Sequence, residues 1–193
     1  MTPEPKAPHQ HFPSLTLQDH RFALRPLTEE DVPAVTACGS DEQIQAWLPL
    51  PDPYTEEDAR WFCMDFSAAQ QQTGHGLVLG IEKDEKLAGA IDLKRTDWQA
   101  RSTEVGYWTA PWARRQGVMT RALTVLSRWV LETQDFTRVE VRVAVGNTAS
   151  ARVAAGAGFT REGVLRRAGY THSGQVDLIV YSLIRDDLRV PRG

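Results

Sequence analysis

The chain has 193 residues, of which 41% are hydrophobic and 24% are charged, and its formal net charge at pH 7 is -3. This length fits a single globular domain, and the negative charge excludes a global basic field for nucleic acid or anionic membranes. No apolar run reaches the roughly 18 residues that predict a membrane span. Residues 1–13 lack the apolar centre of a signal peptide, so we expect a cytoplasmic protein.

The first half of the chain predicts an arm, strand material and helices. Residues 1–14 are expected to form a flexible arm, because they are rich in Pro and His. Apolar residues then recur at every second position within 15–27, which indicates strand. Helices are predicted to begin at the Thr-Glu-Glu-Asp sequences 28–31 and 55–58, which resemble capping boxes. The prolines within 48–53 predict a loop between these helices.

The cysteines and the first histidines predict neither a disulfide nor a metal site. Cys38 and Cys63 flank apolar helical residues, which favours buried small side chains. His9 and His11 lie in the polar arm, with no cysteine or acidic partner nearby in the sequence. We therefore expect no metal cofactor.

The second half of the chain alternates strands with helices. A polar turn at 83–85 between two apolar runs indicates a β-hairpin. A strand, a long amphipathic helix and a strand of alternating valines then predict a right-handed parallel crossover. This order gives an α/β single domain with a mixed sheet over residues 15–188, followed by a tail at 189–193. The expected strands are 76–82, 86–94, 103–109, 137–145, 163–168 and 176–183, and the expected helices are 120–134 and 147–157.

The turn after strand 103–109 carries the strongest chemical signal. Gly117 in this turn lets the backbone approach a ligand closely. The helix that follows has no obvious capping residue, so its first amides and the positive end of its dipole suit a phosphate. Arg114, Arg115 and Arg121 add positive charge. A solvated basic helix start is the alternative, whereas a Walker loop is excluded because no Gly-Lys-Ser/Thr follows.

Two parts of the chain resemble the motifs of GNAT acetyltransferases. Thr103–Trp108 and the turn Arg114–Thr120 are together similar to the acetyl-CoA-binding motif of the family. Asn147–Ser150, followed by Gly158-Phe159, resembles the motif on the next strand and helix. Both parts occur in the order and spacing that the family has.

Residues 163–165 and 176–183 also resemble the RimJ/RimL-like branch, which includes ribosomal-protein N-terminal acetyltransferases. The resemblance covers residues 15–188 and implies a GNAT fold, with a splayed central pair of parallel strands flanked by helices. Acetyl-CoA would lie between these strands as a cosubstrate. The residues implied in binding it are Trp108, Thr109, Arg114, Arg115, Gln116, Gly117, Val118, Met119, Thr120 and Asn147.

The resemblance implies direct attack of an amine on acetyl-CoA, with Ser150 beside the leaving thiolate. A base must also accept a proton from the amine. We favour Glu104, although a structural ion pair with an arginine explains this residue equally well. Asp92 and Asp177 are alternatives, because a carboxylate inside an apolar strand can have a raised pKa. Tyr170 is a fourth candidate.

Two positions depart from the patterns of the family. Ala154 stands where many members carry a tyrosine as general acid. Gly169 stands where the RimL-like pattern carries a glutamate before its tyrosine, a proposed base. This second departure keeps open a non-catalytic acyl-CoA-binding sensor as an alternative function.

The acceptor is expected to bind between the early helices and the loop 47–54, with Trp47 and Tyr54 as wall residues. Trp61 and Trp129 are expected in the core. The branch resemblance favours a protein N-terminus as acceptor, and a polyamine or aminoglycoside is the small-molecule alternative. A domain that binds ATP with the same turn is a further alternative. Both a monomer and a homodimer are consistent with the sequence.

Overall fold

The computed structural model describes residues 10–19 and 22–189. These residues form one mixed sheet with the strand order β1-β2-β3-β4-β5-β6-β8-β7. β5 and β6 are parallel, whereas the other neighbouring pairs are antiparallel. The expected α/β fold with one parallel crossover is confirmed. The strands are β1 (Leu17–Asp19), β2 (Phe22–Arg25), β3 (Leu77–Lys83), β4 (Lys86–Asp97), β5 (Ser102–Thr109), β6 (Arg138–Ala144), β7 (Thr160–Thr171) and β8 (Gly174–Ile184).

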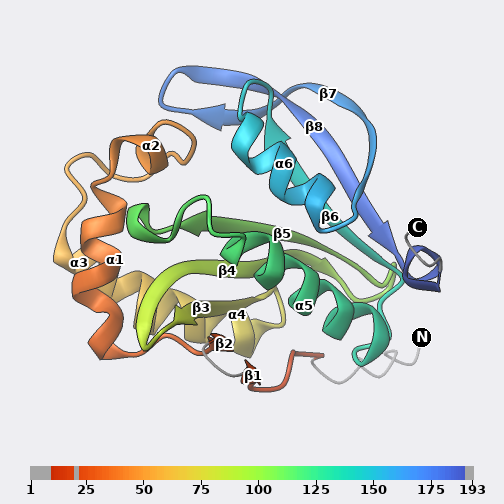
Figure 1. Ribbon diagram of the computed structural model, residues 1–193, viewed down its shortest axis with the longest axis horizontal. Helices are drawn as coiled ribbons and strands as arrows, with labels where there is room; N and C mark the ends of the chain where they lie inside the picture. The colour runs from red at the N-terminus through yellow and green to blue at the C-terminus, as the bar shows by residue number, and fades with distance from the viewer. Residues whose placement is uncertain (1–9, 20–21, 190–193) are drawn as a thin grey trace, which may run out of the picture.

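Helices cover both faces of this sheet (Figure 1). α5 and α6 lie on one face, and α3 and α4 lie behind the sheet on the other. The helices are α1 (Val32–Gly39), α2 (Glu42–Gln45), α3 (Glu56–Arg60), α4 (Ser67–Thr73), α5 (Val118–Glu132) and α6 (Thr148–Gly156). A π-helical turn, Trp61–Phe66, joins α3 to α4, and short 3-10 helices span Glu29–Asp31, Pro111–Ala113 and Arg185–Arg189.

The end of the predicted arm packs into the core. Residues 1–9 of that arm lie outside the described residues. Phe12 is completely buried, and its ring centroid lies 4.8 Å from that of Trp98 and 5.5 Å from that of Phe136. Gln71 donates a hydrogen bond to the Phe12 carbonyl at 3.1 Å. Burial of such a ring stabilises a fold by about 1.5–3 kcal/mol, so the chain is anchored from this residue onwards.

The predicted helix starts are present, but the second helix departs from regular geometry. The Thr55 amide donates to Asp58 Oδ2 at 2.8 Å, and the Asp58 amide donates to Thr55 Oγ1 at 3.2 Å, which completes a capping box. The π-helical turn that follows brings residues five apart onto one line, and the Trp61 and Phe66 ring centroids lie 5.1 Å apart. The expectation that Trp61 is buried is wrong, since it is 54% exposed.

The main core lies between the sheet and α5. Val139, Val141 and Val143 alternate along β6, and all three are buried. They belong to one cluster with Leu123 and Leu126 of α5. The packing fixes α5 across β4, β5 and β6, so its N-terminus stands beside the end of β5.

Candidate active site

β5 and β6 separate partway along their length. Within the described sheet their parallel register covers three residue pairs and ends at Glu104↔Glu140. β5 continues to Thr109 alongside β4, and β6 continues to Ala144 alongside β8. Figure 1 shows the two strands diverging towards α2 and the β7–β8 hairpin. We call the point after Glu104 and Glu140 the fork. Beyond the fork, backbone groups of β5 that point away from β4 can pair with an extended ligand.

Trp108 and Thr109, two of the predicted cofactor-binding residues, lie on β5 beyond the fork. They pair with Ala90 and Gly89 of β4, respectively. A Cβ at Gly89 would lie 2.3 Å from the Trp108 carbonyl oxygen, so glycine is needed for the close approach of these strands. The Trp108 indole packs against the apolar clusters of α1 and α2. The Trp108 side chain is therefore engaged in the fold, which leaves its backbone to contact a ligand between the strands.

The turn after β5 leaves the N-terminus of α5 open. Gly117 precedes α5 with a φ of 72°, in the left-handed region that favours glycine. No described atom lies within 4 Å of the position that its Cβ would take. Arg115 also has a positive φ of 61° and is exposed. Among the described residues no side chain caps α5. The first amides of α5 are thus suited to bind an anion.

The first residues of α5 offer backbone rather than side chains to a ligand. Val118 and Met119 are 5% and 4% exposed and belong to the main core. Thr120 faces α6, where a Cβ at Gly156 would lie 3.2 Å from its Cγ2. These contacts hold the start of α5 in place.

The charged residues of the turn are partly engaged in the fold. The Arg114 guanidinium binds Asp41, which accepts hydrogen bonds from the first amides of α2, including that of Ile44 at 3.0 Å. This hydrogen bond from Arg114 is the main reason why the pKa of Asp41 lies below its usual range. Lys83, at the end of β3, contacts the Gln116 side chain. It brings to the turn a cation that the sequence analysis did not single out.

Asn147 and Ser150 lie at the start of α6, and Tyr107 reaches them from β5. The Asn147 side chain caps α6 by accepting a hydrogen bond from the Ser150 amide at 3.0 Å. The Tyr107 hydroxyl lies 2.9 Å from Ser150 Oγ and 3.1 Å from the Ser150 carbonyl oxygen. Burial raises the pKa of Tyr107 to about 12, so it stays protonated at neutral pH. Tyr107 was not among the predicted site residues.

Glu104, the favoured base, lies in an ion-pair network at the closed end of the fork. It is 7% exposed. Its Oε2 lies 2.9 Å from Arg95 and 3.3 Å from Arg142, and its Oε1 lies 3.7 Å from Lys94. The alternative interpretation of Glu104 as a structural ion-pair residue fits these contacts better than a role as base.

Asp92 lies directly beyond the fork, opposite Gly106 of β5. A Cβ at Gly106 would lie 2.6 Å from Asp92 Oδ1 and 2.7 Å from Lys94 Nζ. Both charged groups can therefore lie close against β5 only because residue 106 is glycine. Burial is the main cause that raises the pKa of Asp92, with nearby Glu104 acting in the same direction and Lys94 opposing it. A carboxylate of this kind is suited to accept a proton.

The remaining candidate bases lie on the β7–β8 hairpin. Asp177 Oδ1 accepts a hydrogen bond from the Arg167 amide at 2.7 Å, which engages it in a bulge of β7. Tyr170 is 64% exposed. A Cβ at Gly169 would lie 2.6 Å from Leu178 Cδ2, so Leu178 occupies the space into which a longer side chain at residue 169 would project.

The two predicted wall residues differ in their surroundings. Trp47 is 37% exposed, and its Cη2 lies 3.5 Å from the position of a Cβ at Gly146, just after β6. The Tyr54 ring instead packs on Gly39 at the end of α1, and burial raises the pKa of Tyr54 to about 12. Trp47 is therefore placed beside the open end of the fork, whereas Tyr54 supports α1.

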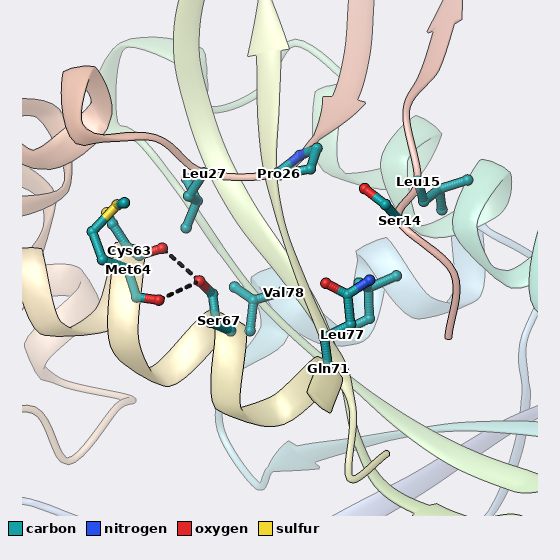
Figure 2. A pocket seen from close by; sticks show the side chains of 11 residues that line it. Ser14, Leu15, Pro26, Leu27, Cys63, Met64, Ser67, Gln71, Leu77 and Val78 are labelled. Carbon is teal, nitrogen blue, oxygen red and sulfur yellow. Dashed lines mark hydrogen bonds between the residues drawn. The ribbon is translucent and has the colours of Figure 1, made fainter. Parts of the chain in front are cut away.

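A separate hollow lies on the α4 side of the sheet (Figure 2). It measures ≈ 230 Å³ and is lined by residues of the N-terminal segment, the segment just after β2, the π-helical turn, α4 and β3. Ser67, shown there, donates to the Cys63 carbonyl at 2.5 Å. Burial raises the pKa of the Cys63 thiol to about 11, as expected for a buried small side chain. β4 separates this hollow from the fork.

The described residues offer neither a membrane-spanning helix nor a metal-binding cluster. No described helix is long and apolar enough to cross a membrane. Residues 10–19 and 22–189 also contain no group of three His, Cys, Asp or Glu side chains placed to hold a metal ion.

Comparison with known proteins agrees with this geometry. The family of acetyltransferase (GNAT) domains matches residues 21–160. The uncharacterized N-acetyltransferase YoaA of Bacillus subtilis (strain 168) is 28% identical over 171 residues, which is 88% of this chain and 96% of YoaA. The ribosomal-protein-serine acetyltransferase of Escherichia coli (strain K12) is 28% identical over 150 residues, 77% of this chain and 83% of that protein.

A solved structure shares the fold over nearly its whole length. RimL, a ribosomal L7/L12 alpha-N-protein acetyltransferase in complex with coenzyme A, gives a TM-score of 0.80 at 24% identity, over 92% of this chain and 99% of RimL. The matching family model places the chain in the class of acetyltransferases. The chain belongs to the GNAT family and is an acetyl-CoA-dependent N-acetyltransferase, as its RimJ/RimL-like resemblance implied.

Proposed function

We propose that the protein transfers the acetyl group of acetyl-CoA to the α-amine of a polypeptide N-terminus, by direct attack in a ternary complex. The fork carries this proposal, because it opens a path between β5 and β6 with an anion-binding helix start on one side and Asp92 on the other. The names of two relatives support the acceptor class, since one is a ribosomal-protein-serine acetyltransferase and the other an alpha-N-protein acetyltransferase.

The cofactor is proposed to lie along the free side of β5. Its pyrophosphate would bind the amides of the turn 115–120, where Gly117 leaves space and the dipole of α5 favours negative charge. Its pantetheine would pair with the backbone at Trp108 and Thr109. The thioester would then reach the fork, with Ser150 on the α6 side of the sulfur.

We propose Asp92 as the base in place of Glu104. Glu104 already has cations within 4 Å of both carboxylate oxygens, whereas in the described chain Asp92 forms no hydrogen bond or ion pair within that distance. The raised pKa of Asp92 gives its carboxylate a higher affinity for the proton of an incoming ammonium group.

The chemistry then needs few groups. Asp92 takes a proton, directly or through water, and the neutral amine attacks the acetyl carbonyl carbon. A backbone N–H near Trp108 stabilises the charge that develops on the carbonyl oxygen. The C–N bond forms, the C–S bond breaks, and the electron pair passes to sulfur, where the Ser150 hydroxyl donates a hydrogen bond. The extra proton on the new amide nitrogen passes, directly or through water, to the thiolate, which leaves as the thiol. Alignment of the two reactants supplies much of the acceleration.

Thiol release from acetyl-CoA tests the acceptor class. The panel contains four amines. The first is a short peptide with a free N-terminus, and the second is that peptide with its N-terminus formylated and an internal lysine as its amine. The other two are spermidine and an aminoglycoside. We expect kcat/KM for the free N-terminus to exceed the others by at least about tenfold, equivalent to 1.4 kcal/mol. Equal or faster acetylation of spermidine or the aminoglycoside would overturn the polypeptide acceptor. Binding of acetyl-CoA without thiol release on any amine would point to the sensor function.

A further inference from the structure

The Tyr107 side chain spans the gap beyond the fork on the α5–α6 face. Tyr107 belongs to β5, and its hydroxyl contacts two atoms of Ser150 in α6, 43 residues later in the chain. Its ring packs against the main core, so only the hydroxyl end faces α6. The contact joins the two halves of the sheet where β5 and β6 no longer pair.

The donors and acceptors of Tyr107 and Ser150 determine which group donates in each hydrogen bond. The Ser150 carbonyl oxygen can only accept, so the bond of 3.1 Å uses the single proton of the Tyr107 hydroxyl. Ser150 Oγ, at 2.9 Å, then donates its own proton to the Tyr107 oxygen. With its amide bound to Asn147 at 3.0 Å, Ser150 is held at three atoms.

The same contact has a second arrangement that needs only hydroxyl rotation. If the Ser150 hydroxyl turns its proton towards a nearby sulfur, the Tyr107 proton can move from the carbonyl oxygen to Ser150 Oγ. Ser150 then donates to sulfur while it accepts from Tyr107, and chains of hydrogen bonds of this kind strengthen one another. No proton leaves Tyr107 in either arrangement.

We propose that Tyr107 is a positioning residue for acetyl transfer, which holds Ser150 across the gap and supports its hydroxyl as a donor to the leaving sulfur. This inference rests on the proposed function, in which Ser150 faces the thioester. Tyr107 acts through Ser150 and touches no reacting atom. Its loss should therefore affect the chemical step rather than the binding of acetyl-CoA.

A double-mutant cycle tests the proposal with wild type, Tyr107→Phe, Ser150→Ala and the double variant. Thiol release gives kcat and KM with the best amine of the panel, and calorimetric titration gives the Kd for CoA. We expect Tyr107→Phe to lower kcat about tenfold, the upper end of the effect of one neutral hydrogen bond, while KM for acetyl-CoA and Kd change less than about twofold. Adding Tyr107→Phe to Ser150→Ala should cause no further loss of kcat.

The control is Tyr181→Phe, which removes a hydroxyl from a buried tyrosine on the neighbouring strand β8. Its kcat should stay within about twofold of wild type. Two results would overturn the proposal and leave Tyr107 as an anchor of α6. One is an equal loss of kcat from Tyr107→Phe with and without the Ser150 hydroxyl. The other is a loss of CoA affinity that parallels the loss of kcat. If a variant melts early, the whole cycle is measured at a temperature where all four proteins are folded. Wild-type turnover on the amine panel tests the proposed function separately.

Discussion

The closed and open ends of the β5–β6 pair use charge in different ways. At the closed end, Glu104 and Glu140 are surrounded by arginines and a lysine in one connected network. At the open end, Asp92 has a raised pKa, and a tyrosine–serine contact replaces the strand pairing. Three neighbouring strands, β4, β5 and β6, thus carry two carboxylates that are paired with cations and one, Asp92, that is not paired within the described part of the chain. A carboxylate inside a strand therefore becomes a candidate base through its neighbours, not through its position in the sequence.

The largest effect should come from Asp92→Asn, which removes the proposed base at the open end. We expect kcat to fall by about 10²–10⁴-fold, the typical contribution of a general base. Thiol release at saturating substrates measures this loss. Turnover close to that of wild type would show that Asp92 is not the base, and the two ends of the strand pair would then not differ in this respect.

Stability provides an independent check on the same variant. Because burial raises the pKa of Asp92, the folded protein binds its proton more tightly than the unfolded chain does. The stability that Asp92 contributes is therefore greatest below the ordinary pKa of an aspartate, and it declines as pH rises through the raised pKa. Near about pH 8, Asp92→Asn should melt at the same temperature as wild type or higher. A drop in Tm would show that the carboxylate serves the fold.

The next largest effect is expected at the cofactor turn, where Gly117→Asp and Gly117→Asn form a matched pair. Both side chains tolerate a positive φ and can cap a helix, but only Asp places a negative charge beside the pyrophosphate. We expect Gly117→Asp to bind acetyl-CoA at least about tenfold more weakly than Gly117→Asn, or 1.4 kcal/mol. Titration calorimetry measures both affinities. Equal affinities in the two variants would count against placing the pyrophosphate at this turn.

A smaller effect on activity and a clearer one on folding are expected at the closed end. Glu104→Gln leaves Arg95, Arg142 and Lys94 without their shared carboxylate. Since Lys94 and Arg95 are well exposed, we expect a loss of only about 1–2 kcal/mol in the free energy of unfolding. kcat should stay within about threefold of wild type. A loss of kcat as large as that of Asp92→Asn would instead favour Glu104, at the closed end, as the base.

The smallest effect is expected from Asp41→Ser. Serine keeps the cap of α2 but removes the ion pair with Arg114. We expect the free energy of unfolding to fall by less than about 1 kcal/mol, as for a partly exposed pair. Chemical denaturation measures this change. Asp41→Ala is the control, because it removes the cap as well and should cost about 1 kcal/mol more.

Local patterns in the sequence predicted the parts of the molecule that depend on neighbouring residues. The capping box at Thr55, the hairpin around residues 83–85 and the alternation along β6 are all present. The turn at Gly117 is also where the sequence placed it, because a glycine and an uncapped helix start are visible without knowledge of the fold.

Features that depend on distant partners could not be predicted in this way. The sequence places Phe12 in a polar arm, whereas in the fold its ring packs against Trp98 and Phe136, which are distant in the chain. Tyr107 lies on a predicted strand, but its contact with Ser150 requires the crossover to be folded. The ion pairing of Glu104 could not be read from the sequence for the same reason, since Arg142 reaches it from the neighbouring strand.

The ion pair between Arg114 and Asp41 links the proposed cofactor turn to the proposed acceptor wall. Arg114 belongs to that turn, and Asp41 caps the helix that leads to Trp47. We expect a rearrangement of the turn on binding of acetyl-CoA to reach Trp47 through this pair of side chains. We expect acetyl-CoA to bind first and the amine second, a kinetic order that product-inhibition patterns would reveal.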